Sequence, residues 1–281
     1  MGLFKKEENQ SRILNDLTEK YKRGNLNIFV IGAGALSNFV MVGLADLRLG
    51  RIVIFDKDKI EETNLNRQVL YFDEVGNYKA VALKKRLKQI STRNVYDYKL
   101  KFFEEDSRKY FGWFGDKPDI LIDCVDNFKT RSLLNKFALK YKIPLISGGT
   151  SPFSGQVVVY VPGVTSCLNC QLDIDRLSEE RERERQGCTI VPEGSVVTTN
   201  QIIGGIMVGE IDRLLNGITP TPGVIRYISA DEDRIGLSKS KPCQCHLNKV
   251  EIPASKKFKL ELPSFNQVRN KIKSYFIEEE L

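Results

Sequence analysis

The stretch LNIFVIGAGALSN, from Leu26 to Asn38, decides the fold. An apolar run that ends in glycines and continues with helix-forming residues predicts a buried strand, a tight turn and the start of a helix. Gly32 would allow the tight turn, Gly34 would let a phosphate approach the backbone, and Ser37 is small enough for helix–strand packing. Amides at the helix start would then face the anion. A simple strand-to-helix turn without a ligand is the alternative.

Apolar strands alternate with helical patterns along the chain, which predicts βαβ units and a mostly parallel α/β sheet flanked by helices. After Gly149 the pattern changes, and an edge or antiparallel strand is expected, followed by a long helix and a further strand. Strands are expected at residues 51–56, 95–103, 118–127, 143–149, 155–163 and 223–230, and helices at residues 10–21, 35–49, 76–90, 129–140 and 195–215.

The composition is that of a globular protein, with 41% hydrophobic and 28% charged residues among 281. The net charge of +7 is spread out, so an acidic or phosphate-bearing partner is favoured and nucleic acid is a minor possibility. The N-terminus shows no signal-peptide pattern, and the apolar run from Ile202 is too short to cross a bilayer. We therefore expect a cytoplasmic protein without a membrane partner.

The stretch FDKDKIEETNLNRQ, from Phe55 to Gln68, concentrates polar side chains directly after the second strand. Asp56 ends that strand about 20 residues beyond the glycine turn, where a carboxylate can hold ribose hydroxyls. Arg67 could grip a triphosphate bidentately, and Asn64 and Gln68 could position it. Because a dehydrogenase needs no such cluster, this loop favours ATP over a nicotinamide dinucleotide.

Two further side chains extend the expected nucleotide site. Lys79 lies in the first turn of its helix, where the helix dipole disfavours a cation, so we expect it to point at an anion. A solvated surface lysine is the alternative. Asp126 and Asn127 close a buried strand, and Asp126 could bind magnesium on the phosphates. The alternative for Asp126 is an N-cap of the next helix, which is compatible with the metal role.

Over residues 25–234 the chain resembles the ThiF/MoeB superfamily. The resemblance lies in these stretches, in chain order: GAGALS, DKDKIEETNLNRQ, Lys79, DCVDN, PLISGG and GQVVVY. This is the adenylating domain shared by sulfur-carrier activating enzymes and ubiquitin-activating enzymes. The resemblance implies a Rossmann-like fold, usually in a dimer, that joins AMP to the C-terminal carboxylate of a small β-grasp protein. It also implies that Arg12 reaches the ATP of the partner subunit. The full set expected at the nucleotide is Gly32, Gly34, Asp56, Asp58, Asn64, Arg67, Gln68, Lys79, Asp126, Asn127 and Arg12, with Arg67, Lys79 and Asp126 catalytic.

Two cysteine pairs lie far apart in the sequence, which is typical of a tetrahedral structural zinc site. The first is Cys167 and Cys170, and the second is Cys243 and Cys245. The resembled family often has both pairs spaced C-x-x-C, whereas the second pair here is C-x-C. Four sulfurs are the predicted ligand set, with His246 as the alternative fourth ligand. Unligated surface cysteines are the remaining interpretation.

Two other cysteines are assigned different roles. Cys124 lies within an expected strand and is predicted to be buried. Cys188 follows a charged stretch expected to be a mobile loop, and the resembled family has a reactive cysteine at this position. Arginines at residues 181, 183 and 185 could lower its pKa, although the alternating glutamates offset them. Cys188 is interpreted either as a catalytic residue or as an incidental loop thiol. The single histidine, His246, argues against Ser-His-Asp chemistry.

These observations predict an N-terminal helical segment over residues 1–24, an adenylation domain over residues 25–254 with a crossover loop at about 171–194, and a tail over residues 255–281. The expected function is ATP-dependent adenylation of a ubiquitin-like or sulfur-carrier protein ending in Gly-Gly, followed by a thioester on Cys188. ATP, Mg²⁺ and Zn²⁺ are the expected cofactors, and a homodimer, a conjugating enzyme or a sulfur donor are the expected partners. Adenylation of a peptide or tRNA-linked carboxylate, and a non-catalytic scaffold subunit, are the alternatives.

Overall fold

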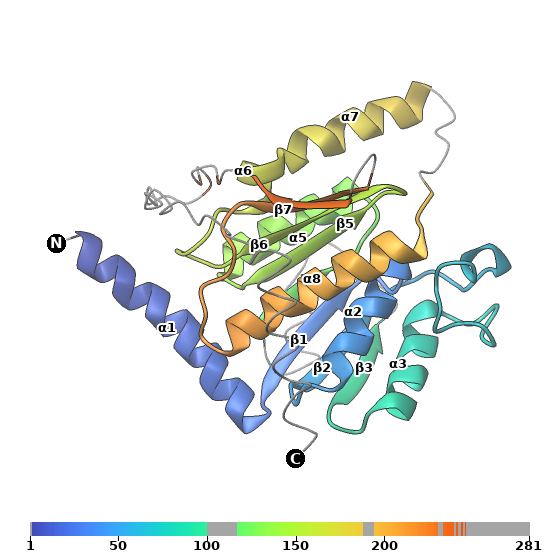
Figure 1. Ribbon diagram of the computed structural model, residues 1–281, viewed down its shortest axis with the longest axis horizontal. Coiled ribbons are helices and arrows are strands. Elements are labelled where there is room, and N and C mark those ends of the chain that lie inside the picture. Colours follow the sequence, from blue (N-terminus) through green and yellow to red (C-terminus); the bar gives the residue numbers. More distant parts are fainter. Residues whose placement is uncertain are drawn as a thin grey trace, which may run out of the picture. The chain divides into compact units, whose positions relative to one another are not determined.

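The computed structural model describes residues 2–99, 117–187, 194–229 and 233–238, with residues 240, 243 and 245. One eight-stranded sheet runs through this part of the chain in the order β3-β2-β1-β4-β5-β6-β7-β8 (Figure 1). Its strands are β1 (Leu26–Ile31), β2 (Gly50–Phe55), β3 (Val95–Lys99), β4 (Ile120–Asp123), β5 (Leu145–Thr150), β6 (Ser154–Tyr160), β7 (Val224–Ser229) and β8 (Asp233–Leu237). The helices are α1 (Gly2–Arg23), α2 (Ala35–Ala45), α3 (Lys79–Ile90), α5 (Phe128–Tyr141), α6 (Leu168–Leu172), α7 (Ile174–Gly187) and α8 (Val197–Leu215), with a 3-10 turn η1 (Glu62–Asn64).

The first five strands are parallel and the last three are antiparallel to their neighbours. Parallel neighbours need a long crossover, and helices α2, α3 and α5 provide one after β1, β2 and β4. Only residues 151–153 join β5 to β6, which is too short for a crossover and gives an antiparallel pair. The predicted Rossmann-like sheet with an antiparallel continuation is therefore confirmed. The strand order reverses between β1 and β4, where open sheets bind ligands.

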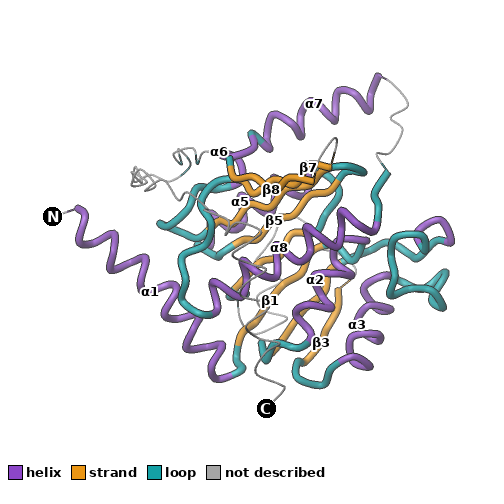
Figure 2. The backbone as a smooth tube through the Cα atoms, in the orientation of Figure 1, coloured by secondary structure: helices purple, strands orange, loops and turns teal. Residues whose placement is uncertain are grey.

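Side chains of the central strands alternate between two buried cores. Ile28 and Val30 of β1 face the core shared with α1, α2, α3 and α8. Phe29 and Ile31 face the second core, which α5, α6 and α7 cover. Figure 1 shows α2 and α8 packed together in front of the sheet, and Figure 2 shows the strands running behind them. Both faces are covered, which explains why the central strands β1, β2 and β4 are mostly apolar.

Residues 174–187 form helix α7, although the sequence suggested a mobile loop at this place. The segment is rich in glutamate and arginine, which are good helix formers, and Arg176 pairs with Glu180 one turn later. Ile174 is fully buried and anchors the start of the helix in the second core. The described side chains after Ile174, up to residue 181, are half-buried or exposed, which explains the lack of an apolar stripe.

Helix α1 starts at Gly2, whereas the sequence predicted its start at residue 10. Leu14 and Leu17 pack this helix against the core of the first 250 residues. The domain boundaries at residues 24 and 254 stay predictions. Across the described ranges of the chain, every helix is too short or too polar to cross a membrane.

Candidate functional site

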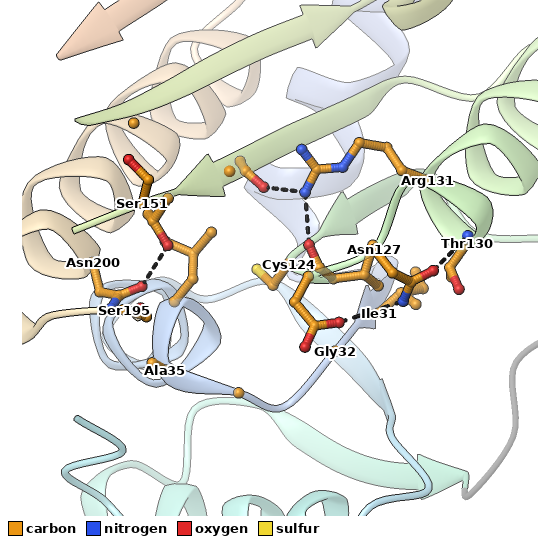
Figure 3. Close-up of a pocket in the computed structure, with 18 of the residues that line it drawn as sticks. Ile31, Gly32, Ala35, Cys124, Asn127, Thr130, Arg131, Ser151, Ser195 and Asn200 are labelled. Carbon is orange, nitrogen blue, oxygen red and sulfur yellow. Dashed lines mark hydrogen bonds between the residues drawn. The ribbon is translucent and has the colours of Figure 1, made fainter. Parts of the chain in front are cut away.

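A cleft of about 1550 Å³ opens at the carboxyl ends of the parallel strands. Its lining comes from the segments after β1, β2, β4 and β5, from the neighbouring strands β6 and β7, and from α7. Figure 3 shows Asn127 and Thr130 on one side of the drawn pocket and Ser151, Ser195 and Asn200 on the other. The cleft therefore extends from the topological switch point to the antiparallel part of the sheet.

The glycine turn has the geometry that the sequence predicted. Gly32 adopts a φ of 94°, and an added Cβ would lie 2.6 Å from the carbonyl oxygen of Cys124, so no other residue fits. Gly34 caps the N-terminus of α2, and a Cβ there would meet nothing within 4 Å. The backbone at Gly34 thus faces open space in the cleft, which is the approach that a phosphate requires.

Asp56 lies beside this turn at the end of β2. Its carboxylate accepts hydrogen bonds from the backbone N–H of Ala33 at 2.7 Å and of Asp58 at 2.8 Å. Burial raises the pKa of Asp56, and the two backbone bonds only partly offset this effect. A carboxylate has about four lone-pair positions, so Asp56 keeps capacity for ribose hydroxyls.

Two predicted cations line the same part of the cleft. The Lys79 side chain is 12% exposed, and its Nζ lies 3.5 Å from a carboxylate oxygen of Asp58. Arg67 donates from Nη1 to the Thr63 carbonyl at 2.9 Å and to the Asn66 side chain at 2.8 Å. Within the described residues its Nε and Nη2 groups make no hydrogen bond, so one edge of the guanidinium can bind phosphate oxygens.

Asn64 and Gln68, both expected at the phosphates, are buried and differ in their bonding. The side-chain oxygen of Asn64 accepts from the backbone N–H of Glu61 at 3.3 Å and so caps the 3-10 turn. Gln68 is 4% exposed, and its side-chain oxygen has no hydrogen-bond partner in the part of the chain that the structure describes. An unpaired buried polar atom is costly, so the Gln68 amide fits a bound polar ligand.

Asp126 and Asn127, which follow β4, have different hydrogen-bonding partners. Asn127 is the N-cap of α5, because its side-chain oxygen accepts from the Thr130 N–H at 2.8 Å. The N-cap of α5 is therefore Asn127 and not Asp126, for which capping was the alternative role. Asp126 is exposed in the cleft, and its carboxylate accepts a hydrogen bond from the side-chain amide of Asn127 at 3.4 Å. An exposed carboxylate at a strand end fits a magnesium ligand.

Arg131 is a site residue that the sequence reading missed. It is 4% exposed, and its Nη2 donates to the Val125 carbonyl at 2.7 Å and the Gly148 carbonyl at 2.6 Å (Figure 3). Its Nε lies 3.1 Å from the fully buried carboxylate of Asp123. Arg131 therefore ties the ends of β4 and β5 together beneath the cleft. Its place three residues before the buried Leu134 marks it as facing inward.

Asn200 is a second residue that the sequence reading missed. It is fully buried, accepts from the Thr150 hydroxyl at 3.0 Å, and donates to the Ser195 hydroxyl and the Val196 carbonyl, both at 2.6 Å. These bonds fasten the start of α8 to the end of β5. They fix the wall of the cleft farther from the glycine turn.

Three of the predicted zinc ligands converge outside the cleft. The sulfur atoms of Cys167, Cys170 and Cys245 all lie within 4.8 Å of one another. Zinc–sulfur bonds of about 2.3 Å in a tetrahedron place sulfurs roughly 3.8 Å apart, so the group fits a zinc site. Cys243 is buried and raises the pKa of the Cys167 thiol by hydrogen bonding, which places it beside the group. Its role as fourth ligand stays a prediction, and His246 lies outside the described residues.

The remaining predicted residues are placed as follows. Cys124 is buried, as expected, and burial raises the pKa of its thiol. Arg12 is exposed on α1 and is not among the residues that line the cleft. Cys188, the predicted acyl acceptor, lies outside the described residues. On α7, which precedes it, Ser178 and Arg181 line the cleft.

Comparisons with known proteins agree with this geometry. The family model described as "ThiF family" matches residues 9–247. The "Adenylyltransferase and sulfurtransferase MOCS3" of Xenopus laevis is 30% identical over 217 residues, which are 76% of this chain and 46% of that protein. The "Sulfur carrier protein adenylyltransferase" of Thermus thermophilus is 35% identical over 144 residues, covering 50% of this chain and 51% of the relative.

The solved structure of E. coli MccB with ATP superimposes with a TM-score of 0.65 at 21% identity, covering 83% of this chain and 67% of that one. This likeness supports the fold. The chain spans about half the length of the curated relatives named above. The family match covers the glycine turn, the strand-end acids and the first cysteine pair together, and we conclude that this chain belongs to the ThiF family.

Proposed function

We propose that this chain uses ATP to adenylate the C-terminal carboxylate of a small ubiquitin-like or sulfur-carrier protein. The observation that carries the proposal is the open backbone at Gly34 beside the carboxylate of Asp56. A phosphate can approach the N-terminus of α2 there while Asp56 accepts from ribose hydroxyls. The names of the curated relatives support the reaction type.

In the proposed reaction, a carboxylate oxygen of the carrier bonds to the α-phosphorus of ATP. The bond from this phosphorus to the oxygen that bridges to the β-phosphorus breaks, and pyrophosphate leaves with the electron pair. Lys79 and the unbonded edge of Arg67 would bind the phosphate oxygens and stabilise the charge that moves onto the leaving group. Asp126 would hold Mg²⁺, which neutralises part of the phosphate charge when bound.

Three finer points belong to the same proposal. The thiolate of Cys188 attacks the acyl carbon of the adenylate, forms a thioester, and releases AMP with the electron pair of the broken C–O bond. A second copy of the chain supplies Arg12 toward the nucleotide of its partner. The Cys167 cluster holds structural zinc, which would join the segment after β6 to the segment after β8.

Carrier-dependent exchange of pyrophosphate into ATP tests the reaction. Lys79→Ala should lower the exchange rate at least tenfold, because the lysine contacts the phosphates in the transition state. Lys88→Ala on the same helix is the matched control, since Lys88 is exposed and does not line the cleft. Equal exchange by both variants would remove Lys79 from the mechanism, and absence of exchange with every candidate carrier would refute the proposed activity.

Cys188→Ala separates the thioester step from adenylation. This variant should keep pyrophosphate exchange and form no thiol-sensitive adduct with the carrier, whereas Cys124→Ala should form the adduct. A full adduct on Cys188→Ala would show that the thiol is incidental.

A further inference from the structure

The end of the cleft that lies over β6 and β7 is lined differently from the nucleotide end. Gln156 of β6 and Arg226 of β7 are direct cross-strand partners, so their side chains project from the same face of the sheet. Both line the cleft, and Ser178 and Arg181 of α7, which are one helical turn apart, line it as well. This end, the distal arm, is therefore bounded by one antiparallel strand pair and one helix.

The distal arm has a charge of one sign. The carboxylates among the cleft-lining residues belong to Asp56, Asp58, Glu61 and Asp126, and all four follow β2 or β4 at the nucleotide end. Arg226 is exposed, and within the described ranges of the chain it forms no ion pair or side-chain hydrogen bond. Its other cross-strand partner is Gly236, where an added Cβ would meet nothing within 4 Å. An unpaired guanidinium with space around it can receive a carboxylate.

The fold also sets the distance between Arg226 and the reacting end of a bound tail. β4 ends three residues before Asp126, and three strand spacings of about 4.8 Å separate β4 from β7, a lateral distance of roughly 14 Å. An extended peptide advances about 3.3 Å per residue, so this distance corresponds to about four residues. A tail whose terminal carboxylate is at the nucleotide therefore brings its fourth residue from the C-terminus close to Arg226.

We propose that the distal arm selects an extended C-terminal tail with an acidic side chain at about the fourth position from its end, and that Arg226 is the residue that reads it. The proposal rests on the proposed adenylation, because it assumes that the tail ends at the nucleotide. Gln156 would hydrogen-bond the tail beside the acidic residue, and Arg181 of α7 lines the same arm. Acidic tails are thereby favoured over neutral and basic ones.

Fluorescein-labelled octapeptides that end in Gly-Gly and differ only at the fourth position from the C-terminus test this directly. Peptides with Glu, Gln or Lys at that position are titrated with the full chain in the presence of a non-hydrolysable ATP analogue. We expect the Glu peptide to bind at least tenfold more tightly than the Lys peptide, with the Gln peptide between them. Arg226→Glu should reverse this order, whereas Lys88→Glu, which makes the same change in net charge away from the cleft, should preserve it.

Equal binding of the three peptides, absence of binding, or the same preference in Arg226→Glu as in the unmodified chain would each overturn the proposal. Pyrophosphate exchange with the same peptides separates this outcome from failure of the proposed activity. Exchange without a charge preference leaves the adenylation intact and refutes the role of Arg226. Charge-selective binding without exchange supports the acidic tail and counts against adenylation of it.

Discussion

Replacing the two glycines of the turn one at a time should separate a structural role from a binding role. In Gly34→Ala the new methyl group meets no protein atom within 4 Å, and the φ of −83° suits any residue. The unfolding free energy should therefore fall by only about 0.5–1 kcal/mol, because alanine is a weaker N-cap than glycine. The same methyl group would occupy the space in which a phosphate approaches the start of α2. Losing one charge-assisted hydrogen bond costs about 1.5–3 kcal/mol, which weakens ATP binding roughly 10- to 150-fold.

Gly32→Ala should behave in the opposite way. Its φ of 94° is strained for alanine, and the Cβ would lie 2.6 Å from a backbone carbonyl oxygen, so we expect a loss of at least about 2 kcal/mol in unfolding free energy. Calorimetric titration with ATP and urea denaturation measure the two quantities in both variants. Unchanged ATP affinity in a folded Gly34→Ala protein would refute the phosphate approach. Unchanged stability of Gly32→Ala would refute the turn geometry.

Three further predictions concern charge and metal. Arg131→Met should lower the unfolding free energy by about 3–5 kcal/mol, because it leaves the buried carboxylate of Asp123 uncompensated; urea denaturation measures this, and a loss below 1 kcal/mol would contradict it. ATP affinity should fall as the pH is lowered through the raised pKa of Asp56, because only the ionised carboxylate accepts from both ribose hydroxyls. The fall should begin at a higher pH than it would for an ordinary aspartate. Titrations from pH 7 to pH 4 should show this fall in the unmodified chain and not in Asp56→Asn. Cys167→Ser should reduce bound zinc from about one equivalent per chain and lower the melting temperature, and elemental analysis that finds no zinc in the unmodified chain would exclude the site.

The positions of residues that belong to one contiguous motif are predictable from sequence. The turn at Gly32 and the acid at Asp56 follow from local rules, because a strand, a glycine turn and a helix determine where both groups lie. Lys79 was predicted from its place in the first turn of a helix, and it does line the cleft. Such inferences need no knowledge of which distant segments come together.

Residues whose roles depend on contacts between distant segments were missed or misassigned. Arg131 bonds to a carbonyl 17 residues away, and Asn200 bonds to a threonine 50 residues away. Neither contact leaves a local pattern, although the inward position of Arg131 on α5 is readable in hindsight. Apolar periodicity alone predicts a loop at helix α7, because this segment has no apolar stripe. Its helix propensity and its Arg176–Glu180 pair were the better signals.

Mass spectrometry of the carrier after incubation with this chain, ATP and Mg²⁺ tests the central claim most directly. Small ubiquitin-like or sulfur-carrier proteins from the same genome are the probes, each compared with a version lacking its final glycine. The account predicts AMP joined to the C-terminal carboxylate of one intact carrier, release of pyrophosphate, and no product with the truncated carrier. Release of ADP instead of pyrophosphate, or AMP attached to a side chain of the carrier, would contradict it.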